Sequence, residues 1–271
     1  MRSLGTAQHP FHPPLHSVLV NHLSVQPSRR FDVVFCDVDG CLMPEVEQVP
    51  EFQSLAFVSD FNRQAMERCD RPVIIPCTGR PQPYAEAVCR LLGCPLAICE
   101  QGVWIYDYLA HRWTMDPAIQ PEDIQIVRTF ERWVETELGP HGCFLQLGKA
   151  AAVTIFHDNV EWLFENVKPQ VEQLVVENNW PLRVSNTWSC INVDLAKVSK
   201  ASAIDRLVHA HRLDPARLAG IGDTMGDLAI RNRVAWFGCP SNADDQLKTH
   251  ADRLATAPLA QGVVELLQAL I

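Results

Sequence analysis

The sequence predicts an α/β protein whose core is a parallel sheet with helices on both faces, plus a smaller inserted domain of helices and strands. Short apolar runs alternate with segments of helical periodicity near both ends of the chain. Such alternation is typical of parallel sheets, because each crossover lays a helix against the sheet. Between the two halves, longer amphipathic helices and paired strand-like segments indicate a separate unit.

The first half of the core is predicted from three strands and one helix. The strands are expected at residues 31–35, 72–77 and 95–99, where β-branched and other apolar residues cluster. The helix carries apolar positions at 84, 88, 91 and 92, and Gly93 is placed to end it.

The second half repeats this pattern. Strands are expected at residues 218–222 and 234–238, with a helix over 227–232 between them. A further helix is expected after Ser241, which together with Asp244 is predicted to form its N-terminal cap, and the last helix is marked by apolar positions from 263 to 270.

The inserted domain is predicted from two amphipathic helices, at about 124–138 and 163–174, each followed by strand-like segments. We expect it to span 113–194, which leaves 31–112 and 195–271 to the core. Six of the seven tryptophans lie between Trp104 and Trp188. They indicate either ordinary packing or a surface on which sugars stack.

Composition excludes several classes of partner. The 271 residues include 32 acidic and 23 basic side chains, a net charge of -9 without a basic cluster, so no nucleic acid or anionic membrane is expected as a partner. No apolar run reaches the length of a membrane span, and the start lacks the pattern of a secretory signal. We therefore expect a cytoplasmic globular protein, and the sequence does not specify its oligomeric state.

The ten cysteines are expected to be reduced and buried. No CxxC pair occurs and most lie in apolar runs, which argues against a disulfide framework or a zinc site. Residues 1–30 form an N-terminal leader in which four histidines stand among prolines. We expect this leader to be loosely ordered rather than metal-binding.

Two aspartates follow the first strand and raise a question of charge. Asp37 and Asp39 face the same side of an extended chain, because side chains alternate. Two such charges roughly 4 Å apart repel by about 4 kcal/mol at an effective dielectric of ~20. A cation or a shared proton must therefore lie nearby.

Other strand ends supply further polar groups. Thr78 and Gly79 follow the second strand, where a hydroxyl and free backbone N–H groups can bind a phosphoryl oxygen. Asp223 and Asp227 follow a later strand. Open α/β sheets bind ligands at this edge, and carboxylates without cysteine or histidine suit Mg²⁺ rather than zinc.

Lys200 is the remaining positive charge of interest. It follows Ser199, a predicted N-cap, at the start of a helix, where the partial positive charge of the helix disfavours a lysine. The mismatch disappears if the lysine faces carboxylates and a phosphate. Helix physics alone leaves a solvated surface lysine equally open.

Four motifs in order resemble those of the haloacid-dehalogenase (HAD) superfamily of aspartate-nucleophile phosphotransferases. They are DVDGCL, CTGR, VSKAS and GDTMGD, and the resemblance extends over residues 31–271. The position of the insert between the second and third motifs, and the tail from Pro240, are similar to the Cof-type and sucrose-phosphatase-like branch. The resemblance implies a Rossmann-like HAD core with an α+β cap domain.

The resemblance also implies catalytic roles. Asp37 would be the nucleophile that forms an aspartyl-phosphate, and Asp39 the general acid and base. Thr78 would bind the transferred phosphoryl group. Lys200 would hold nucleophile and phosphate together, and it matches the family pattern better than Lys197.

The implied cofactor is Mg²⁺, held by Asp37, the main-chain carbonyl of Asp39, and Asp223. Asp227 would lie on the ion or directly behind its ligands. Gly226 stands where the Cof-type pattern usually has asparagine, which leaves the role of Asp227 open.

Substrate choice is expected to lie with the cap, because the core supplies phosphate chemistry only. Gly79, Arg80 and Lys149 are the predicted substrate-binding residues, and a contact from Arg80 to the cap is the alternative for that residue. Lys149 follows Gly148 at a predicted hairpin that would aim it at the cleft. An exposed turn lysine is the alternative there.

These residues predict a Mg²⁺-dependent phosphatase that hydrolyses a small phosphorylated metabolite, foremost a sugar phosphate, through an aspartyl-phosphate. The alternatives are a phosphomutase of the phosphomannomutase-like type and a non-catalytic module that binds a phosphorylated metabolite.

Overall fold

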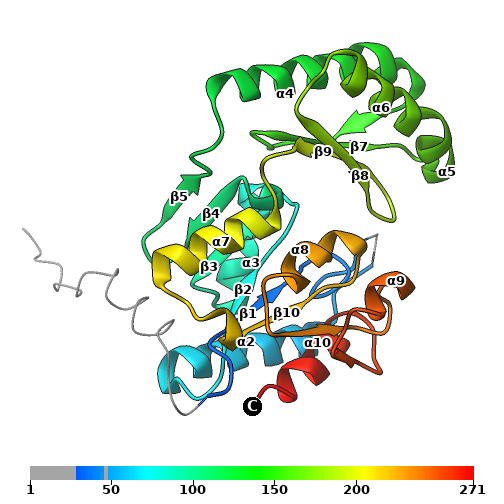
Figure 1. Cartoon of the computed structure of the whole chain (residues 1–271). Coiled ribbons are helices and arrows are strands. Elements are labelled where there is room, and N and C mark those ends of the chain that lie inside the picture. Colours follow the sequence, from blue (N-terminus) through cyan, green and yellow to red (C-terminus); the bar gives the residue numbers. More distant parts are fainter. Residues whose placement is uncertain (1–28, 46–47) are drawn as a thin grey trace, which may run out of the picture.

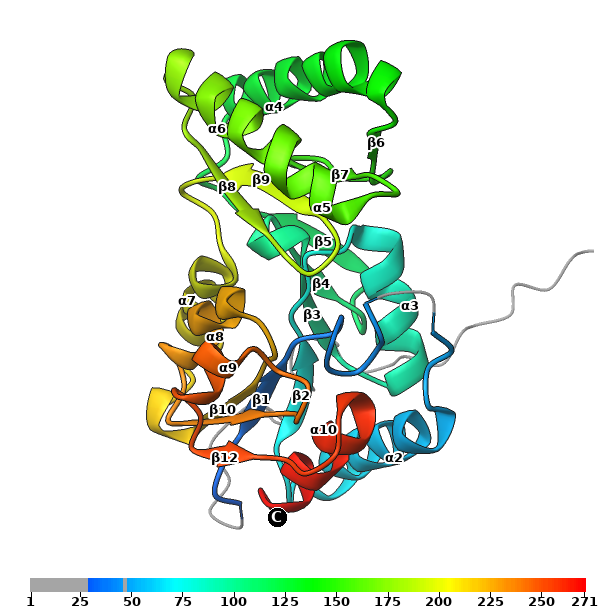
Figure 2. The same cartoon turned by 90° about the vertical axis from the view of Figure 1, so that its right-hand side faces the viewer.

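The computed structural model describes residues 29–45 and 48–271. Figures 1 and 2 show two stacked parts, a larger core that contains the C-terminus and a smaller helix-covered sheet above it. Apart from its last two residues, the predicted leader and its four histidines lie outside the described residues.

The core is built on a parallel sheet with the strand order β12-β11-β10-β1-β2. Cys36, at the end of β1, stands in register with Ile221 of β10 and Pro76 of β2. The residues after these three strands therefore leave the sheet at one edge. The strands are β1 (Val33–Cys36), β2 (Val73–Pro76), β10 (Leu218–Ile221), β11 (Trp236–Cys239) and β12 (Arg253–Leu254).

Helices cover both faces of this sheet because its strands are apolar on both sides. On one face, Val34 and Ile74 share a core with buried residues of α2 (Phe52–Arg68), α3 (Gln82–Leu92) and α10 (Leu259–Gln268). On the other, Val33 and Phe35 share one with α7 (Lys200–His211), α8 (Leu228–Arg231) and α9 (Asp245–Lys248). The predicted fold class is confirmed.

A second, antiparallel sheet flanks the core. It contains β3 (Leu96–Cys99), β4 (Trp104–Asp107) and β5 (Arg112–Met115), and a single parallel bridge from Cys77 to Ile98 links it to the end of β2. Strand β3 is among the predicted elements, whereas β4, β5 and helix α2 are not. In β5 and α2, charged or polar residues interrupt the apolar positions. The predicted end of α3 is confirmed, since Gly93 has the left-handed φ of 65°.

The smaller part is an antiparallel sheet with the order β6-β7-β9-β8, covered on one face by helices (Figure 1). Its strands are β6 (Phe144–Leu145), β7 (Ala152–Phe156), β8 (Leu182–Asn186) and β9 (Ile191–Leu195). The helices are α4 (Pro121–Trp133) with the π-helical turn Val134–Leu138, and α5 (Val160–Trp162), which runs through the π-helical turn Leu163–Val167 into α6 (Lys168–Glu177).

Alternation along β7 and β9 gives this sheet two different faces. Val153, Ile155 and Val193 pack in one core with the helices. Thr154 and Asn192, which stand opposite each other in register, point to the other face, toward the core sheet. The elements of this part lie between Pro121 and Leu195, whereas β5 pairs beside the core. The predicted domain limits at 113 and 194 stay a prediction.

Within the described residues, four short helical turns connect the longer elements. The turns are Glu100–Gly102, Gly139–His141, Pro215–Arg217 and Met225–Asp227. All ten cysteines are free thiols and all except Cys69 are buried. In the described part of the chain, no helix combines the length and the apolar composition needed to cross a bilayer.

Candidate active site

Three buried carboxylates meet at the carboxyl edge of the central sheet. Asp37 follows β1, Asp223 follows β10, and Asp227 lies in the turn that leads into α8. Ligand oxygens of the three side chains all lie within 4.8 Å of one another. Because β1 and β10 are neighbouring parallel strands, the fold itself brings these distant residues together.

Lys200 supplies positive charge to this cluster. Its Nζ lies 2.9 Å from Asp37 Oδ1 and 2.7 Å from Asp227 Oδ1, and the lysine is buried. Burial opposes the charged form, but Asp227 and Asp37 together raise the pKa of Lys200 well above its usual value. Lys200 is therefore a buried, ion-paired lysine and not a solvated surface lysine. The competing Lys197 instead pairs with Asp123 at 2.6 Å.

Asp227 has both carboxylate oxygens engaged. Oδ1 accepts from Lys200, while Oδ2 accepts from the backbone N–H groups of Asp223, at 3.0 Å, and Thr224, at 3.2 Å. Its side chain thus anchors Lys200 and the turn after β10. These bonds direct the Asp227 carboxylate to Lys200 and to the turn after β10.

Asp223 has an oxygen to spare. Its Oδ2 is buried and has no hydrogen-bond partner in the described part of the chain, and Oδ1 accepts only a weak bond of 3.7 Å from the Cys41 thiol. Burial, followed by the charges of Asp37 and Asp227, raises the pKa of Asp223 to about 9. Gly40 makes room for this carboxylate, since it has a φ of +81° and a Cβ there would lie 2.0 Å from Oδ2.

These features fit a hard divalent cation. Asp37 also has a pKa raised well above its usual value, first by burial and then by Asp227. An unpartnered buried oxygen beside a second carboxylate is costly unless a cation or a proton compensates it. The donors are oxygens only, which suits Mg²⁺.

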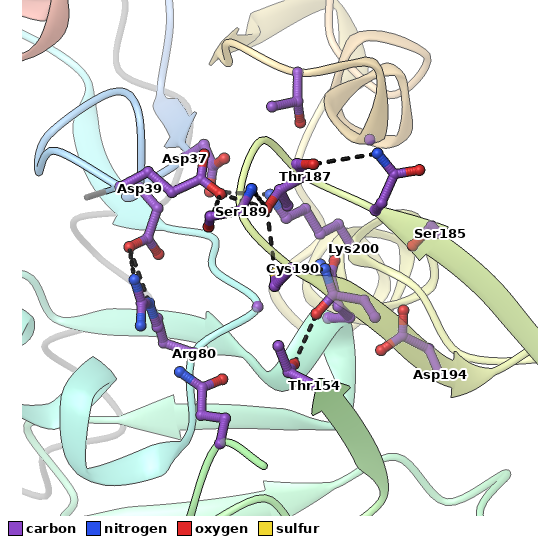
Figure 3. A pocket seen from close by; sticks show the side chains of 18 of the residues that line it. Asp37, Asp39, Arg80, Thr154, Ser185, Thr187, Ser189, Cys190, Asp194 and Lys200 are labelled. Atoms are coloured by element: carbon purple, nitrogen blue, oxygen red, sulfur yellow. Dashed lines mark hydrogen bonds and ion pairs between the residues drawn. The ribbon is translucent and has the colours of Figure 1, made fainter. Parts of the chain in front are cut away.

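Asp39 points away from this cluster toward Arg80, as Figure 3 shows. Its Oδ1 accepts from Arg80 Nε at 2.9 Å, and its Oδ2 accepts from the Thr78 hydroxyl at 3.3 Å. Thr78 Oγ1 in turn accepts from the backbone N–H of Arg80 at 3.0 Å. Arg80, predicted to contact substrate or cap, thus pairs with Asp39 and also lies over the Tyr84 ring.

A cavity of about 510 Å³ opens beside these groups, between the core and the smaller sheet. Asp37, Asp39, Gly79 and Lys200 line it from the core. Gly79 is closely approached, since a Cβ there would lie 2.8 Å from Gln101 Nε2. Lys149 lines it as well and is only 7% exposed, so it is not the exposed turn lysine that was the alternative.

Comparison with known proteins places this arrangement in a family. The pattern of the haloacid dehalogenase-like hydrolases matches residues 147–267, which include Lys200, Asp223 and Asp227. The chain is a hydrolase that resembles the haloacid dehalogenase-like family over residues 147–267.

Individual relatives support this assignment. The hydrolase is 27% identical to a phosphoglycolate phosphatase of Archaeoglobus fulgidus over 208 residues, which cover 76% of this chain and 85% of the relative. It also resembles two solved structures, Thermoplasma acidophilum 0175 (TM-score 0.70, 15% identity) and a haloacid dehalogenase-like hydrolase of Bacteroides thetaiotaomicron (TM-score 0.69, 14% identity). Each likeness covers 89% of this chain, and it covers 98% of the Thermoplasma protein and 100% of the Bacteroides protein. At these low identities the likeness shows the fold.

The hydrolase has further cavity residues that sequence reasoning missed. Glu45, in the loop after Asp39, accepts hydrogen bonds from the hydroxyls of Thr187 and Ser189 on the β8–β9 turn, which ties core and smaller sheet together across the cavity. The wall on the smaller sheet is polar and includes Thr154, Arg183, Asn192 and Asp194. The available signal was the alternation of polar with apolar residues along β7 and β9.

The raised carboxylate pKa values predict how the hydrolase responds to pH without metal. Unfolded aspartates titrate near pH 3.9, so between about pH 5 and 9 the folded protein holds more protons than the unfolded chain. Stability in EDTA should therefore fall as pH rises, by up to about 1.4 kcal/mol per pH unit for each such carboxyl. Urea unfolding across this range measures the slope. Asp223→Asn should flatten it, and an unchanged slope in that variant would contradict this explanation.

Proposed function

We propose that this hydrolase is a Mg²⁺-dependent phosphatase that releases phosphate from a small phosphorylated metabolite through a phosphorylated Asp37. The observation that carries this proposal is the pairing of Asp37 with Lys200 at 2.9 Å in the wall of a ligand-sized cavity, beside the unpartnered oxygen of Asp223. A buried lysine that holds a carboxylate in one position fits a nucleophile better than a merely structural ion pair does.

In the first step, an oxygen of Asp37 attacks phosphorus, and the bond from phosphorus to the ester oxygen breaks. Asp39 donates a proton to the departing oxygen, so that the alcohol leaves neutral. Lys200 lies against Asp37 and contributes positive charge where the phosphoryl oxygens gather. Thr78, whose hydroxyl donates to Asp39, would bind one of these oxygens.

In the second step, water attacks the phosphorus of the Asp37 phosphate, Asp39 takes its proton, and the Asp37 oxygen leaves with its electron pair. Asp39 must exchange its bond to Arg80 for one to substrate or water in both steps. The ion pair with Arg80 holds the Asp39 carboxylate beside the cavity, and Asp39 takes up a proton from water when it leaves this pair for the substrate.

Asp37 and Asp223 would hold the metal, together with the main-chain carbonyl of Asp39, and Asp227 would support Lys200 from behind. When bound, the ion supplies positive charge to the phosphoryl oxygens and offsets the repulsion among the carboxylates. Burial is the largest cause of the raised pKa values of Asp37 and Asp223, and the charge of a bound ion would lower both values.

Two classes of leaving group compete for the cavity. The sequence predicts a sugar, whereas the relative of Archaeoglobus fulgidus, and those of Sulfolobus acidocaldarius and two further archaea, are named phosphoglycolate phosphatases. Glycolate is a short carboxylic acid. The likeness to the relative of Sulfolobus acidocaldarius covers only 33% of this chain. A panel of sugar phosphates and phosphorylated acids, assayed for phosphate release with Mg²⁺ and with EDTA, distinguishes the two classes and tests the proposal itself.

The same assay addresses the other functions. A phosphomutase would interconvert isomers without releasing phosphate and would need a bisphosphate activator. A non-catalytic module would bind esters without turnover, which the retained Asp37, Asp39 and Lys200 argue against. We also propose a cytoplasmic location, because free thiols are typical of a reducing compartment.

Asp39→Asn tests the acid and base role. An amide cannot give or take the proton, so kcat should fall by about 10²–10⁴-fold while the fold persists. Steady-state kinetics at saturating Mg²⁺ measure the loss. A substrate with a good leaving group, such as p-nitrophenyl phosphate, needs less protonation and should lose less in the first step. Full activity of the variant on an alkyl phosphate would remove Asp39 from the mechanism.

A further inference from the structure

The cavity wall formed by the smaller sheet contains one cation that no carboxylate neutralises at short range. Four cationic side chains line the cavity, from Arg80, Lys149, Arg183 and Lys200. Arg80 pairs with Asp39 at 2.7 Å, Arg183 with Asp194 at 3.6 Å, and Lys200 with two aspartates. Lys149 forms no ion pair within 4.0 Å of its nitrogen anywhere in residues 29–45 and 48–271.

Lys149 also has hydrogen-bonding capacity to spare. An ammonium group has three donors. The Lys149 side chain makes one hydrogen bond with described residues, to the hydroxyl of Thr154, which donates in turn to Asn192 Oδ1 at 2.7 Å. Because Thr154 and Asn192 are buried, these two hydrogen bonds hold the ammonium group in one place. A buried ammonium with two unused donors beside a cavity is suited to a ligand anion.

The loop that carries Lys149 is fixed to the core. Glu100 is fully buried and accepts from the backbone N–H groups of Ala150, at 2.6 Å, and Ala151, at 2.7 Å. Glu100 also contacts the segment from Thr78 to Arg80, since its own N–H donates to the Arg80 carbonyl at 2.9 Å. Lys149 is thereby held at a defined position relative to Thr78 and Asp37, as a ligand that bridges both ends of the cavity requires.

The tryptophan surface considered for sugar stacking does not contribute to the cavity. None of the seven tryptophans, all of which the structure describes, lines it. The wall near Lys149 presents hydroxyl and amide groups, with Asp194 and Glu100 as the carboxylates whose charge reaches the lysine. Burial lowers the pKa of Lys149, in the direction expected for a cation that lacks a close partner.

We propose that Lys149 binds a carboxylate on the leaving group, so that the hydrolase prefers phosphate esters of short hydroxy acids over esters of uncharged alcohols and sugars. This inference rests on the proposed phosphatase function and adds the class of substrate to it. The phosphoryl group would lie at Asp37 and Lys200, and the acid group at Lys149 and its partners Thr154 and Asn192.

Matched pairs of esters test this preference. 2-Phosphoglycolate and 2-hydroxyethyl phosphate differ only in a carboxylate against a hydroxymethyl group, and so do 3-phosphoglycerate and glycerol 3-phosphate. The wild-type enzyme should favour the acid of at least one pair in kcat/KM. In Lys149→Met, the ratio within that pair should fall by about 10–100-fold, the value of a lost charged hydrogen bond. Lys149→Arg should restore part of the ratio.

Lys168→Met is the matched control. It removes the same charge from the same part of the molecule, but Lys168 lies on α6, outside the cavity, where it bonds Asn186. It should leave the ratio unchanged. An unchanged ratio in a folded Lys149→Met enzyme, or a wild-type preference for the uncharged ester in both pairs, would overturn the inference.

A binding measurement separates this inference from the proposed function. Asp37→Asn should bind the acidic ester without turning it over, and calorimetry should show weaker binding in Asp37→Asn/Lys149→Met by a similar factor. If no ester is hydrolysed but this difference is found, the phosphatase proposal fails and the subsite stands. If esters are hydrolysed without a difference, the subsite fails alone.

Discussion

Asp37→Asn should reduce phosphate release by at least about 10⁴-fold, because the amide cannot attack phosphorus. The variant should stay folded. Burial already favours a neutral group at this position, and Asp227 still pairs with Lys200. Steady-state assays at saturating Mg²⁺, with circular dichroism as the test of folding, measure both effects.

Asp205→Asn provides the control for this variant. Asp205 lies on the outer side of α7 and pairs with Arg233, away from the cavity. Its replacement should leave turnover close to that of the wild type, since exposed pairs contribute little. Substantial activity in Asp37→Asn would mean that water attacks the ester directly, with Asp37 serving only the metal.

Lys200→Met should have the second large effect, on stability as well as turnover. Lys200 neutralises Asp37 and Asp227 in a buried site, and removal of one partner from a buried ion pair typically costs about 3–5 kcal/mol. The pKa of Lys200 is raised, so its contribution persists throughout the neutral range and disappears only under strongly alkaline conditions. Turnover should fall by about 10³-fold or more, since the charge near the phosphoryl group is lost.

Denaturant unfolding of Lys200→Met in EDTA measures this loss of stability. The loss should shrink toward acid pH, where Asp37 and Asp223 take up protons, and Mg²⁺ should restore part of it. Lys197→Met is the comparison, because Lys197 forms a partly exposed pair with Asp123 and its loss should cost below about 1 kcal/mol. Equal stabilities of the two variants would show that Lys200 does not neutralise the site.

The sequence indicated the core end of the cavity because its residues stand next to local structural signals. Asp37, Thr78 and Asp223 each follow an apolar run that ends a strand, and Lys200 follows an N-cap serine whose hydroxyl accepts from Ser202 N–H at 3.1 Å. Parallel strands end at one edge, so the pattern along the chain was sufficient to group these residues. The same pattern could not assign a role to each residue, because the roles depend on which carboxylate oxygens bond to Lys200 and to the backbone N–H groups.

The opposite wall of the cavity could not be predicted in the same way. Asn192 and Thr154 look like ordinary strand residues, and their burial depends on how two strands distant in sequence pair and face the core. Glu100 gave no signal either. It adopts a left-handed φ of 51°, unusual for this residue type, and its Oε1 accepts from backbone N–H groups that lie about fifty residues away. Lys149 is the one residue of this wall that the sequence indicated, because the preceding Gly148 predicted a turn there. Gly148 has a φ of +88° in the structure.

Transfer of the phosphoryl group to Asp37 can be tested by rapid acid quench followed by peptide mass spectrometry. The enzyme is mixed with Mg²⁺ and an ester that it hydrolyses, then quenched within one turnover. The mechanism predicts a phosphate on the peptide containing residues 31–42, located at Asp37 and absent from Asp37→Asn. Phosphate on a different residue, or none on the enzyme while turnover proceeds, would contradict it.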